Sequence, residues 1–350
     1  MNHKTLVILT PGFAKDESDT TCLPMQQSFI RALNEKFPQL NIIIIAFQYP
    51  YFKKTYQWFG NTVISFNGRN RGGFVKLFLR RKCIAVMKKI HNSNKINGVL
   101  SFWYGECALV GKRFADKHRV KHYCWMWGQD ARNNNKYPSF VLLKPDELIA
   151  FSDFLQNEFE KNHGIRPLHV ITPGIDVKEF YFGNAKKDID IIAAGSLIPL
   201  KQYDIFIQVI AEIKKRIPLI KAVLIGDGPE KNKLQSLIAS SGLQSNITLT
   251  GELSHPDVLR WMQRGKVFLH PSSYEGFGIV CIEALYAGAH VISFVKPMHA
   301  EIENWHIAAG KQDMIQKSIE ILKNPKSEYR SIIPYRMEES IQKMLRLFPT

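Results

Sequence analysis

Two glutamates eight residues apart, Glu275 and Glu283, are the side chains whose type and spacing best suit chemistry in this sequence. An apolar run at 266–270 precedes them and predicts a strand. The pattern from about 279 to 287 predicts a helix that ends at Gly288. Glu275 is therefore expected on the turn after a strand, and Glu283 on the second turn of the next helix. One carboxylate could bind the hydroxyls of a sugar and the other those of a ribose.

Between these glutamates lie Gly276, Phe277 and Gly278, at the expected start of the helix. Backbone N–H groups at a helix start lack partners within the helix and can face an anion. These amides would suit phosphates, so the whole segment has the chemistry needed to hold a nucleotide sugar. The plain alternative is a solvated pair of surface carboxylates beside a glycine turn.

Strands and helices alternate along the chain, and this alternation predicts an α/β fold. Near-continuous apolar strands between helices are typical of parallel sheets that are covered on both faces. Strands are expected at 6–9, 41–47, 98–102, 122–126, 147–151, 169–171, 188–193, 222–225, 247–249, 267–269 and 290–294. Helices are expected at 25–36, 77–91, 107–117, 152–162 (with Ser152 as N-cap), 202–216, 229–241, 256–264, 279–287, 314–323 and 335–347.

Length and charge set broad limits on the protein. With 350 residues the chain exceeds the roughly 250–300 at which a single core stops growing, so two domains are expected. The net charge of +16 favours acidic partners, which are nucleic acid, anionic lipid or a phosphate-bearing substrate. The charge does not choose among them.

The cysteines and the apolar runs indicate in which cellular compartment the protein is expected. Five scattered cysteines without a Cys-x-x-Cys spacing argue against a disulfide framework or a zinc site, and they fit a reducing cytoplasm. The first apolar run, 6–9, predicts a strand rather than a signal peptide. Because no apolar run reaches 18 residues, no segment is expected to span a membrane.

The segment around the two glutamates resembles the donor site of group 1 retaining glycosyltransferases, which have the GT-B fold and a Glu-x7-Glu motif. Glu-Gly-Phe-Gly follows from the first glutamate and Glu-Ala-x-x-Ala-Gly from the second. The resemblance implies two Rossmann-like, doubly wound domains that face a central cleft. It implies an acceptor-binding domain over 1–172, a nucleotide-sugar-binding domain over 173–334, and a last helix at 335–350 that packs back on the first domain.

Two further motifs resemble the family's donor-binding segments. Gly195–Lys201 matches the pattern Gly-Arg-Leu-x-x-x-Lys, with Ser196 where arginine is usual. Lys201 would stabilise the leaving nucleoside diphosphate; otherwise it is a surface lysine after a turn. Gly226 begins a Gly-Asp-Gly-Pro turn that lets the backbone approach a ligand closely, although a plain tight turn explains it equally well.

The first domain carries weaker matches to the family. Gly12 occupies the place of a glycine loop that lies over the donor diphosphate. The segment from Trp127 to Asp130 has tryptophan where many relatives have His-Gly-x-Asp. Asp130 could accept a hydrogen bond from a sugar or an acceptor, and Trp127 could wall a sugar face or belong to the core. Glu106 is interpreted as a peripheral glutamate.

The stretch 69–82 combines six basic residues with Phe74 and Phe78. A basic segment with exposed aromatic residues can lie on an anionic bilayer. The alternative is a core helix with a solvated basic edge. No sequence signature of an RNA-binding module accompanies the stretch, so no nucleic-acid partner is expected.

The resemblance implies a retaining glycosyltransferase that moves a sugar from a UDP- or GDP-sugar to a hydroxyl of a glycan or a lipid-linked acceptor. Glu275 and Lys201 would be catalytic and Glu283 would bind the ribose, without a metal or any other cofactor. The expected setting is bacterial surface polysaccharide assembly, in the cytoplasm or peripherally on the inner face of its membrane. The alternative is a non-catalytic sugar-nucleotide-binding or membrane-associated scaffold protein of the same fold.

Overall fold

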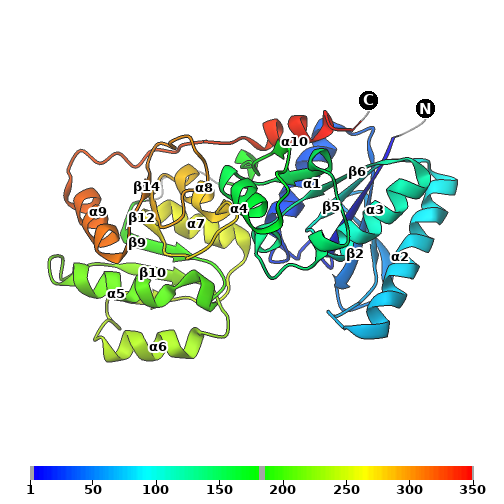
Figure 1. Ribbon diagram of the computed structural model, residues 1–350. Helices are drawn as coiled ribbons and strands as arrows, with labels where there is room; N and C mark the ends of the chain where they lie inside the picture. Colours follow the sequence, from blue (N-terminus) through cyan, green and yellow to red (C-terminus); the bar gives the residue numbers. More distant parts are fainter. Residues whose placement is uncertain (1–3, 181–185, 349–350) are drawn as a thin grey trace. The chain divides into compact units, whose positions relative to one another are not determined.

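The computed structural model describes residues 4–180 and 186–348, and the chain folds into two units (Figure 1). Unit 1 contains Met1–Gly174 and Met337–Thr350, and unit 2 contains Ile175–Arg336. The chain therefore passes from one unit to the other at two points, each two residues beyond the boundary expected from the sequence. At these points the two segments pair with each other, since Ile175 N–H donates to the Tyr335 carbonyl at 3.0 Å.

Unit 1 is built on an eight-stranded sheet in the order β3-β4-β2-β1-β5-β6-β7-β8. All neighbouring strands are parallel except β3 and β4, which are antiparallel. Strand β1 lies between β2 and β5, so the strand order reverses beside β1. The carboxyl ends of these three strands therefore meet at the point of reversal. The strands are β1 Thr5–Gly12, β2 Asn41–Tyr49, β3 Lys54–Trp58, β4 Asn61–Ser65, β5 Ile96–Phe102, β6 Lys121–Trp125, β7 Leu148–Ala150 and β8 His169–Val170.

The hairpin of β3 and β4 was not expected from the sequence. Its strands are short and half polar, so they lack the apolar runs that predicted the other strands. The turn is made by Phe59 and Gly60, which have positive φ values of 42° and 77°. Such a two-residue turn suits the twist of a hairpin.

In the described residues of unit 1 the α-helices are α1 Pro24–Lys36, α2 Gly73–Ser93, α3 Glu106–His118, α4 Asp153–His163 and α10 Met337–Leu345. Helices α2 and α3 share one hydrophobic core with β1, β2 and β5. Helix α10 packs on α1 (Figure 1). The predicted N-cap of α4 is confirmed, because Ser152 Oγ accepts the Leu155 N–H at 3.0 Å.

Unit 2 has a six-stranded parallel sheet in the order β11-β10-β9-β12-β13-β14. Its strands are β9 Ile189–Ala194, β10 Ala222–Ile225, β11 Ile247–Leu249, β12 Gly265–His270, β13 His290–Ser293 and β14 Trp305–Ile307. Its helices are α5 Tyr203–Lys214, α6 Lys231–Ser240, α7 His255–Arg264, α8 Ile279–Tyr286 and α9 Lys311–Lys323. The short edge strand β14 was not expected from the sequence.

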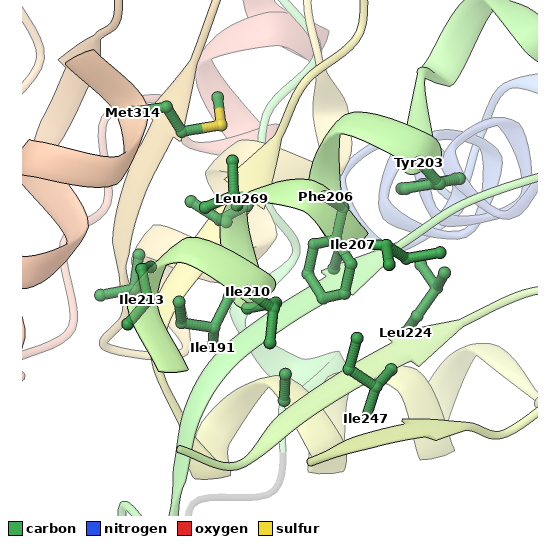
Figure 2. Packing of buried hydrophobic residues seen from close by; sticks show 14 of the residues in the cluster. Ile191, Tyr203, Phe206, Ile207, Ile210, Ile213, Leu224, Ile247, Leu269 and Met314 are labelled. Carbon is green, nitrogen blue, oxygen red and sulfur yellow. The ribbon is translucent and has the colours of Figure 1, made fainter. Parts of the chain in front are cut away.

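One face of the unit 2 sheet is covered by α5, α6 and α9. Their apolar side chains meet those of the strands in a core that includes Phe206, Ile210 and Met314 (Figure 2). Helices α7 and α8 pack against each other and against β12. Helices thus pack against both β9 and β12. The candidate functional residues follow these two strands in the sequence.

In the part of the chain that the structure describes, every helix is too short or too polar to cross a membrane.

Candidate functional site

Lys201 follows β9 and ends a short 3-10 turn, Pro199–Lys201, just before α5 begins. Its Nζ lies 2.5 Å from Glu275 Oε2, although the two residues are 74 positions apart in the sequence. The backbone sets up this approach, because the Ser273 N–H donates to the Leu200 carbonyl at 3.1 Å. The turn after β9 and the loop after β12 are therefore tied together at the residues next to the ion pair.

A histidine that the sequence analysis missed also contacts Glu275. His270 ends β12 and is buried, and its Nε2 lies 3.0 Å from Glu275 Oε2. Since a carboxylate accepts hydrogen bonds, His270 Nε2 carries the proton and donates. Both contacts go to Oε2, so this oxygen is the one that Lys201 and His270 hold in place.

These contacts decide the charge of each group. Burial works to raise the pKa of Glu275, but the hydrogen bond from His270 and the charge of Lys201 outweigh it and lower this pKa to about 2. Burial lowers the pKa of His270, against the opposing effect of Glu275. At neutral pH the arrangement is therefore an ionised carboxylate held between an ammonium group and a neutral imidazole.

The buried thiol of Cys281 lies close enough to the predicted side chains for their charges to affect its pKa. Cys281 lies on α8 and is buried, and burial raises its pKa well above the ordinary value. The charges of Glu275, Lys201 and Glu283 all act on this same thiol. The structure therefore brings Lys201 and Glu275 into direct contact, and donor-binding roles for these two residues and Glu283 stay predictions.

The start of α8 has the conformation that a glycine turn allows. Gly278 is the N-cap residue with φ +84°, and a Cβ there would lie 3.5 Å from Glu275 Cγ and 3.3 Å from Cys281 Sγ. Phe277 is buried and packs edge-on against Tyr335, with ring centroids 5.6 Å apart. Phe277 thus anchors the loop through its ring.

Glu283 also contacts a histidine, and this contact was not expected from the sequence. His255, the first residue of α7, places its Nε2 2.8 Å from Glu283 Oε1. Glu179 lies on the other side of the same ring, 3.9 Å from Nδ1. His255 is 28 positions from Glu283, so no local pattern reveals the pair. The prediction of a helix from 256 to 264 nevertheless placed His255 at a helix start.

The glycine turn at Gly226 packs against the turn that leads to Lys201. A Cβ on Gly226 would lie 2.0 Å from the Gly195 carbonyl oxygen, and the Gly226 N–H donates to the Gly251 carbonyl at 2.9 Å. This close approach of two backbones explains why a glycine is needed there. Ser196, which precedes the buried Leu197, is exposed. Donor-binding roles for Gly226 and Ser196 stay predictions.

In unit 1, Asp130 and Trp127 lie beside a residue that was overlooked, Trp103. The Trp103 and Trp127 rings stack, with centroids 4.2 Å apart and planes 8° apart. The carboxylate of Asp130 accepts the Trp127 N–H at 2.8 Å. Burial raises the pKa of Asp130 to about 7, against the effect of hydrogen bonds from backbone N–H groups. Asp130 is thus able to exchange a proton near neutral pH.

A cavity of about 490 Å³ opens beside Asp130. It is lined by residues at or just beyond the carboxyl ends of β1, β2, β5 and β6, and by the start of α2 and the segment before it: Pro11, Phe47, Gln48, Asn70, Arg71, Gly72, Lys76, Trp103, Tyr104, Gly105, Glu106, Cys107, Gln129, Asp130, Arg132, Asn134, Asn135 and Tyr137. Gly12 follows the lining residue Pro11 in the sequence, and the Trp127 ring stacks on the lining residue Trp103. The interpretation of Glu106 as peripheral is wrong, since its side chain lines this cavity and is 11% exposed.

The comparison with protein families identifies the second half of the chain. Residues 176–337 match the family model of the glycosyl transferases group 1. This segment spans all but the first residue of unit 2, and it contains Lys201, Glu275 and Glu283. The second unit is therefore similar to the glycosyl transferases group 1, as the sequence predicted.

Individual relatives agree with this assignment. The phosphatidylinositol N-acetylglucosaminyltransferase gpi3 subunit of Schizosaccharomyces pombe is 36% identical over 204 residues, which are 56% of this chain and 45% of the relative. The glycosyltransferase MJ1178 of Methanocaldococcus jannaschii is 27% identical over 212 residues, which are 59% of this chain and 58% of the relative. The chain thus spans about half the length of the curated relatives it matches.

A solved structure extends the likeness of fold to both units. Anabaena HepE, in a crystal with UDP and glucose, matches with a TM-score of 0.73 over 98% of this chain and 99% of its own, at 16% identity. Two α/β domains with parallel sheets are common to both proteins. The predicted GT-B fold is therefore confirmed for the chain as a whole.

Proposed function

We propose that the protein is a retaining glycosyltransferase that moves a sugar from a nucleoside-diphosphate sugar to a hydroxyl of a glycan or a lipid-linked acceptor. The observation that carries this proposal is the ion pair of Lys201 and Glu275 beside the start of α8, with His270 on the same carboxylate oxygen. The arrangement offers one cation for phosphate and one oriented anion for sugar hydroxyls within the same site.

The donor would be held by unit 2. Its diphosphate would compete with Glu275 for Lys201, and the amides from Gly276 to Gly278 would add further donors. Glu275 Oε1 would then accept from hydroxyls of the transferred sugar, while His270 keeps Oε2 in place. Glu283, oriented by His255, would accept from the ribose hydroxyls.

In the transfer step, the bond between the anomeric carbon and the phosphate oxygen breaks and a bond to the acceptor oxygen forms on the same face. The acceptor's proton passes to the departing phosphate oxygen, so no protein base is needed. Lys201 stabilises the negative charge that grows on the diphosphate, which is the role a metal ion has in other transferases. The reaction is therefore proposed to be independent of metal.

The remaining features of the substrates follow from the relatives. The crystal of HepE with UDP and glucose supports UDP as the nucleotide, with GDP as the alternative. The gpi3 subunit acts in a phosphatidylinositol glycosyltransferase, which supports a lipid acceptor and leaves room for partner subunits. We place the acceptor on unit 1, and the protein at the cytoplasmic face of a membrane that carries a growing surface glycan.

The test compares Glu275→Ala and Lys201→Ala with the wild-type protein for release of nucleoside diphosphate from UDP- and GDP-sugars. Each variant should lose at least about 100-fold in turnover, because each removes a preorganised charge at the reacting diphosphate sugar. Glu212→Ala and Lys215→Ala remove an exposed ion pair on α5 and its end, and they are matched controls that should keep full activity.

Folding of each variant is checked by circular dichroism. If both site variants are folded and still release nucleoside diphosphate at the wild-type rate, the assignment of the site is wrong.

A second candidate is a non-catalytic sugar-nucleotide-binding protein, which Ser196 in place of the usual arginine favours. With Ser196 in that place, the donor site has one cation fewer for the leaving diphosphate. Titration calorimetry with UDP-sugars separates the two candidates, since binding without release of UDP would support the non-catalytic protein.

A further inference from the structure

The cavity of unit 1 lies where a doubly wound sheet is expected to bind a ligand. Its lining residues lie at or just beyond the carboxyl ends of β1, β2, β5 and β6, and the strand order reverses beside β1, between β2 and β5. A larger hollow of about 700 Å³ lies at the opposite edge, where Thr5, Asn41 and Asn97 stand near the amino ends of their strands. The position in the fold thus favours the smaller cavity as a binding site.

The backbone beside the cavity is held in a strained conformation. Trp103 directly follows β5 with φ +70°, which a bulky side chain rarely adopts. Such a conformation is unfavourable for a residue other than glycine, and it persists where the surroundings enforce it. Here the Trp127 ring stacks on Trp103, and the Trp103 N–H donates to the Trp125 carbonyl at 3.2 Å. Strain of this kind is concentrated at functional sites.

Buried ionic contacts make one wall of the cavity rigid. Glu106 accepts from Arg80 Nη2 at 2.6 Å, lies 2.8 Å from Lys76 Nζ, and accepts from the Tyr137 hydroxyl. Burial works to raise the pKa of Glu106, but these donors outweigh it and lower the pKa below its ordinary value. One carboxylate is thus shared by two cations, and the wall has a surplus of positive charge.

Two arginines increase that surplus. Arg71 and Arg132 line the cavity together with Lys76, whereas Asp130 and Glu106 are its carboxylates. Exposed amide side chains of Gln129 and Asn134 add neutral hydrogen-bond donors. A guanidinium group binds phosphate oxygens through two parallel hydrogen bonds, so arginines in a polar cavity suit a phosphate ester.

We propose that this cavity of unit 1 binds a phosphate ester, through Arg71, Arg132 and Lys76, and that the ester is part of the acceptor. The identity of the ligand as an acceptor rests on the proposed glycosyltransferase activity, but its binding to the cavity does not. Asp130 lies at the same wall, where its carboxyl group can accept a hydrogen bond from a hydroxyl of the bound molecule.

The surroundings of Arg71 point to the source of the phosphate. Arg71 and Gly72 lead directly into α2, whose first turns expose Phe74 (91%) and Phe78 (58%). A lipid whose phosphate lies in the cavity could extend its apolar part along these rings. A soluble phosphate ester would use the same cations without needing the aromatic side chains.

The experiment titrates glycerol 3-phosphate into the full-length protein by calorimetry, with glycerol and glycerate as comparison ligands. Glycerol 3-phosphate should bind and glycerol should not, whereas glycerate should bind at least about tenfold more weakly. Arg71→Gln and Arg132→Gln should each weaken binding of glycerol 3-phosphate about tenfold or more, since a charge-assisted hydrogen bond is lost. Arg81→Gln, on the exposed side of α2, is the matched control and should bind as the wild type does.

Each result decides a separate question. Displacement of glycerol 3-phosphate by phosphatidylcholine vesicles that contain phosphatidic acid, but not by pure phosphatidylcholine, identifies a lipid phosphate; no displacement identifies a soluble one. Equal binding of glycerate and glycerol 3-phosphate, or equal affinities of Arg71→Gln and Arg81→Gln in folded protein, would overturn the proposal. UDP binding is titrated in parallel, so failure of the donor site and failure of this cavity are distinguished.

Discussion

At the scale of single residues, His270 explains how a buried carboxylate can stay ionised and correctly oriented. Lys201 alone could neutralise Glu275, but an ammonium group on a flexible chain does not fix the direction of a carboxylate. The imidazole ends a central strand and is buried, so its position is set by the core. His270 is thus a positioning residue, and it acts on the donor through Glu275.

We expect His270→Leu to lower kcat for nucleoside diphosphate release by about 10- to 100-fold, which matches the loss of one hydrogen bond to a charged group. KM for the sugar nucleotide should change less, because Lys201 and Glu283 stay in place. His270→Gln puts an amide donor near the position of Nε2 and should recover a large part of the loss. Steady-state kinetics of both variants make the comparison.

A purely structural role for His270 gives a different pattern. In that case His270→Leu and His270→Gln would lower activity only in proportion to a loss of folded protein, which thermal melting measures. Equal kcat values for the two variants at full folding would also contradict the positioning role.

The sequence predicted some of these residues and could not predict others. Glu275, Glu283 and Lys201 lie in continuous motifs beside strand and helix signals, so their types and spacing were enough to propose them, and the structure brings Lys201 and Glu275 into contact. His255 and His270 become partners of the glutamates through the packing of α7, β12 and α8. A histidine in an apolar strand or at a helix start has no local feature that names its partner.

At the scale of elements, α2 is the helix that differs most from expectation. The predicted start at 77 is four residues too late, since α2 begins at Gly73. The added first turn presents Phe74 and Val75 to solvent. By contrast α8 was predicted closely, and Gly288 follows its end with φ +80°, because a left-handed glycine has a clear signal.

The exposed beginning of α2 is proposed to contact an anionic bilayer. Apolar side chains and basic residues lie together from 69 to 82, in the first turns of α2 and the segment before it, and each cation near such a surface contributes about 1 kcal/mol. The double variant Phe74→Ser/Phe78→Ser should sediment with phosphatidylglycerol vesicles several-fold less than the wild type. Binding should also fall as salt increases.

Leu219→Ser is the matched control for the vesicle experiment, since Leu219 is 87% exposed and belongs to unit 2. It should bind vesicles as the wild type does. If Leu219→Ser and the double variant lose vesicle binding equally, α2 is not the contact with the bilayer. The same conclusion follows if neither the wild type nor the double variant binds.

At the scale of the whole molecule, the last helix makes unit 1 discontinuous in sequence. Met337, Ile341 and Met344 of α10 are buried, and the Tyr123 hydroxyl donates to the Leu347 carbonyl at 2.8 Å. The alternation of strands and helices predicted two α/β units and nearly all of their strands. The place of α10 came from the family resemblance, because a short amphipathic helix does not indicate which sheet it covers.

We expect Met344→Ala to destabilise unit 1 by about 2–5 kcal/mol, the usual cost of removing a large side chain from a core. Lys343→Ala, at the neighbouring exposed position, should have little effect. Differential scanning calorimetry should show a lower unfolding temperature for unit 1 alone. A shift that is equal in Met344→Ala and Lys343→Ala would contradict the packing of α10.

The contact between Lys201 and Glu275 has a consequence for ligand choice. A molecule that enters this site gains the ammonium group by displacing a carboxylate, so it must carry negative charge of its own. Nucleosides and free sugars lack that charge, whereas a diphosphate carries more than a monophosphate does. Affinity should therefore rank with the number of phosphates, which would let the protein reject the abundant uncharged sugars of a cell before any hydroxyl is recognised.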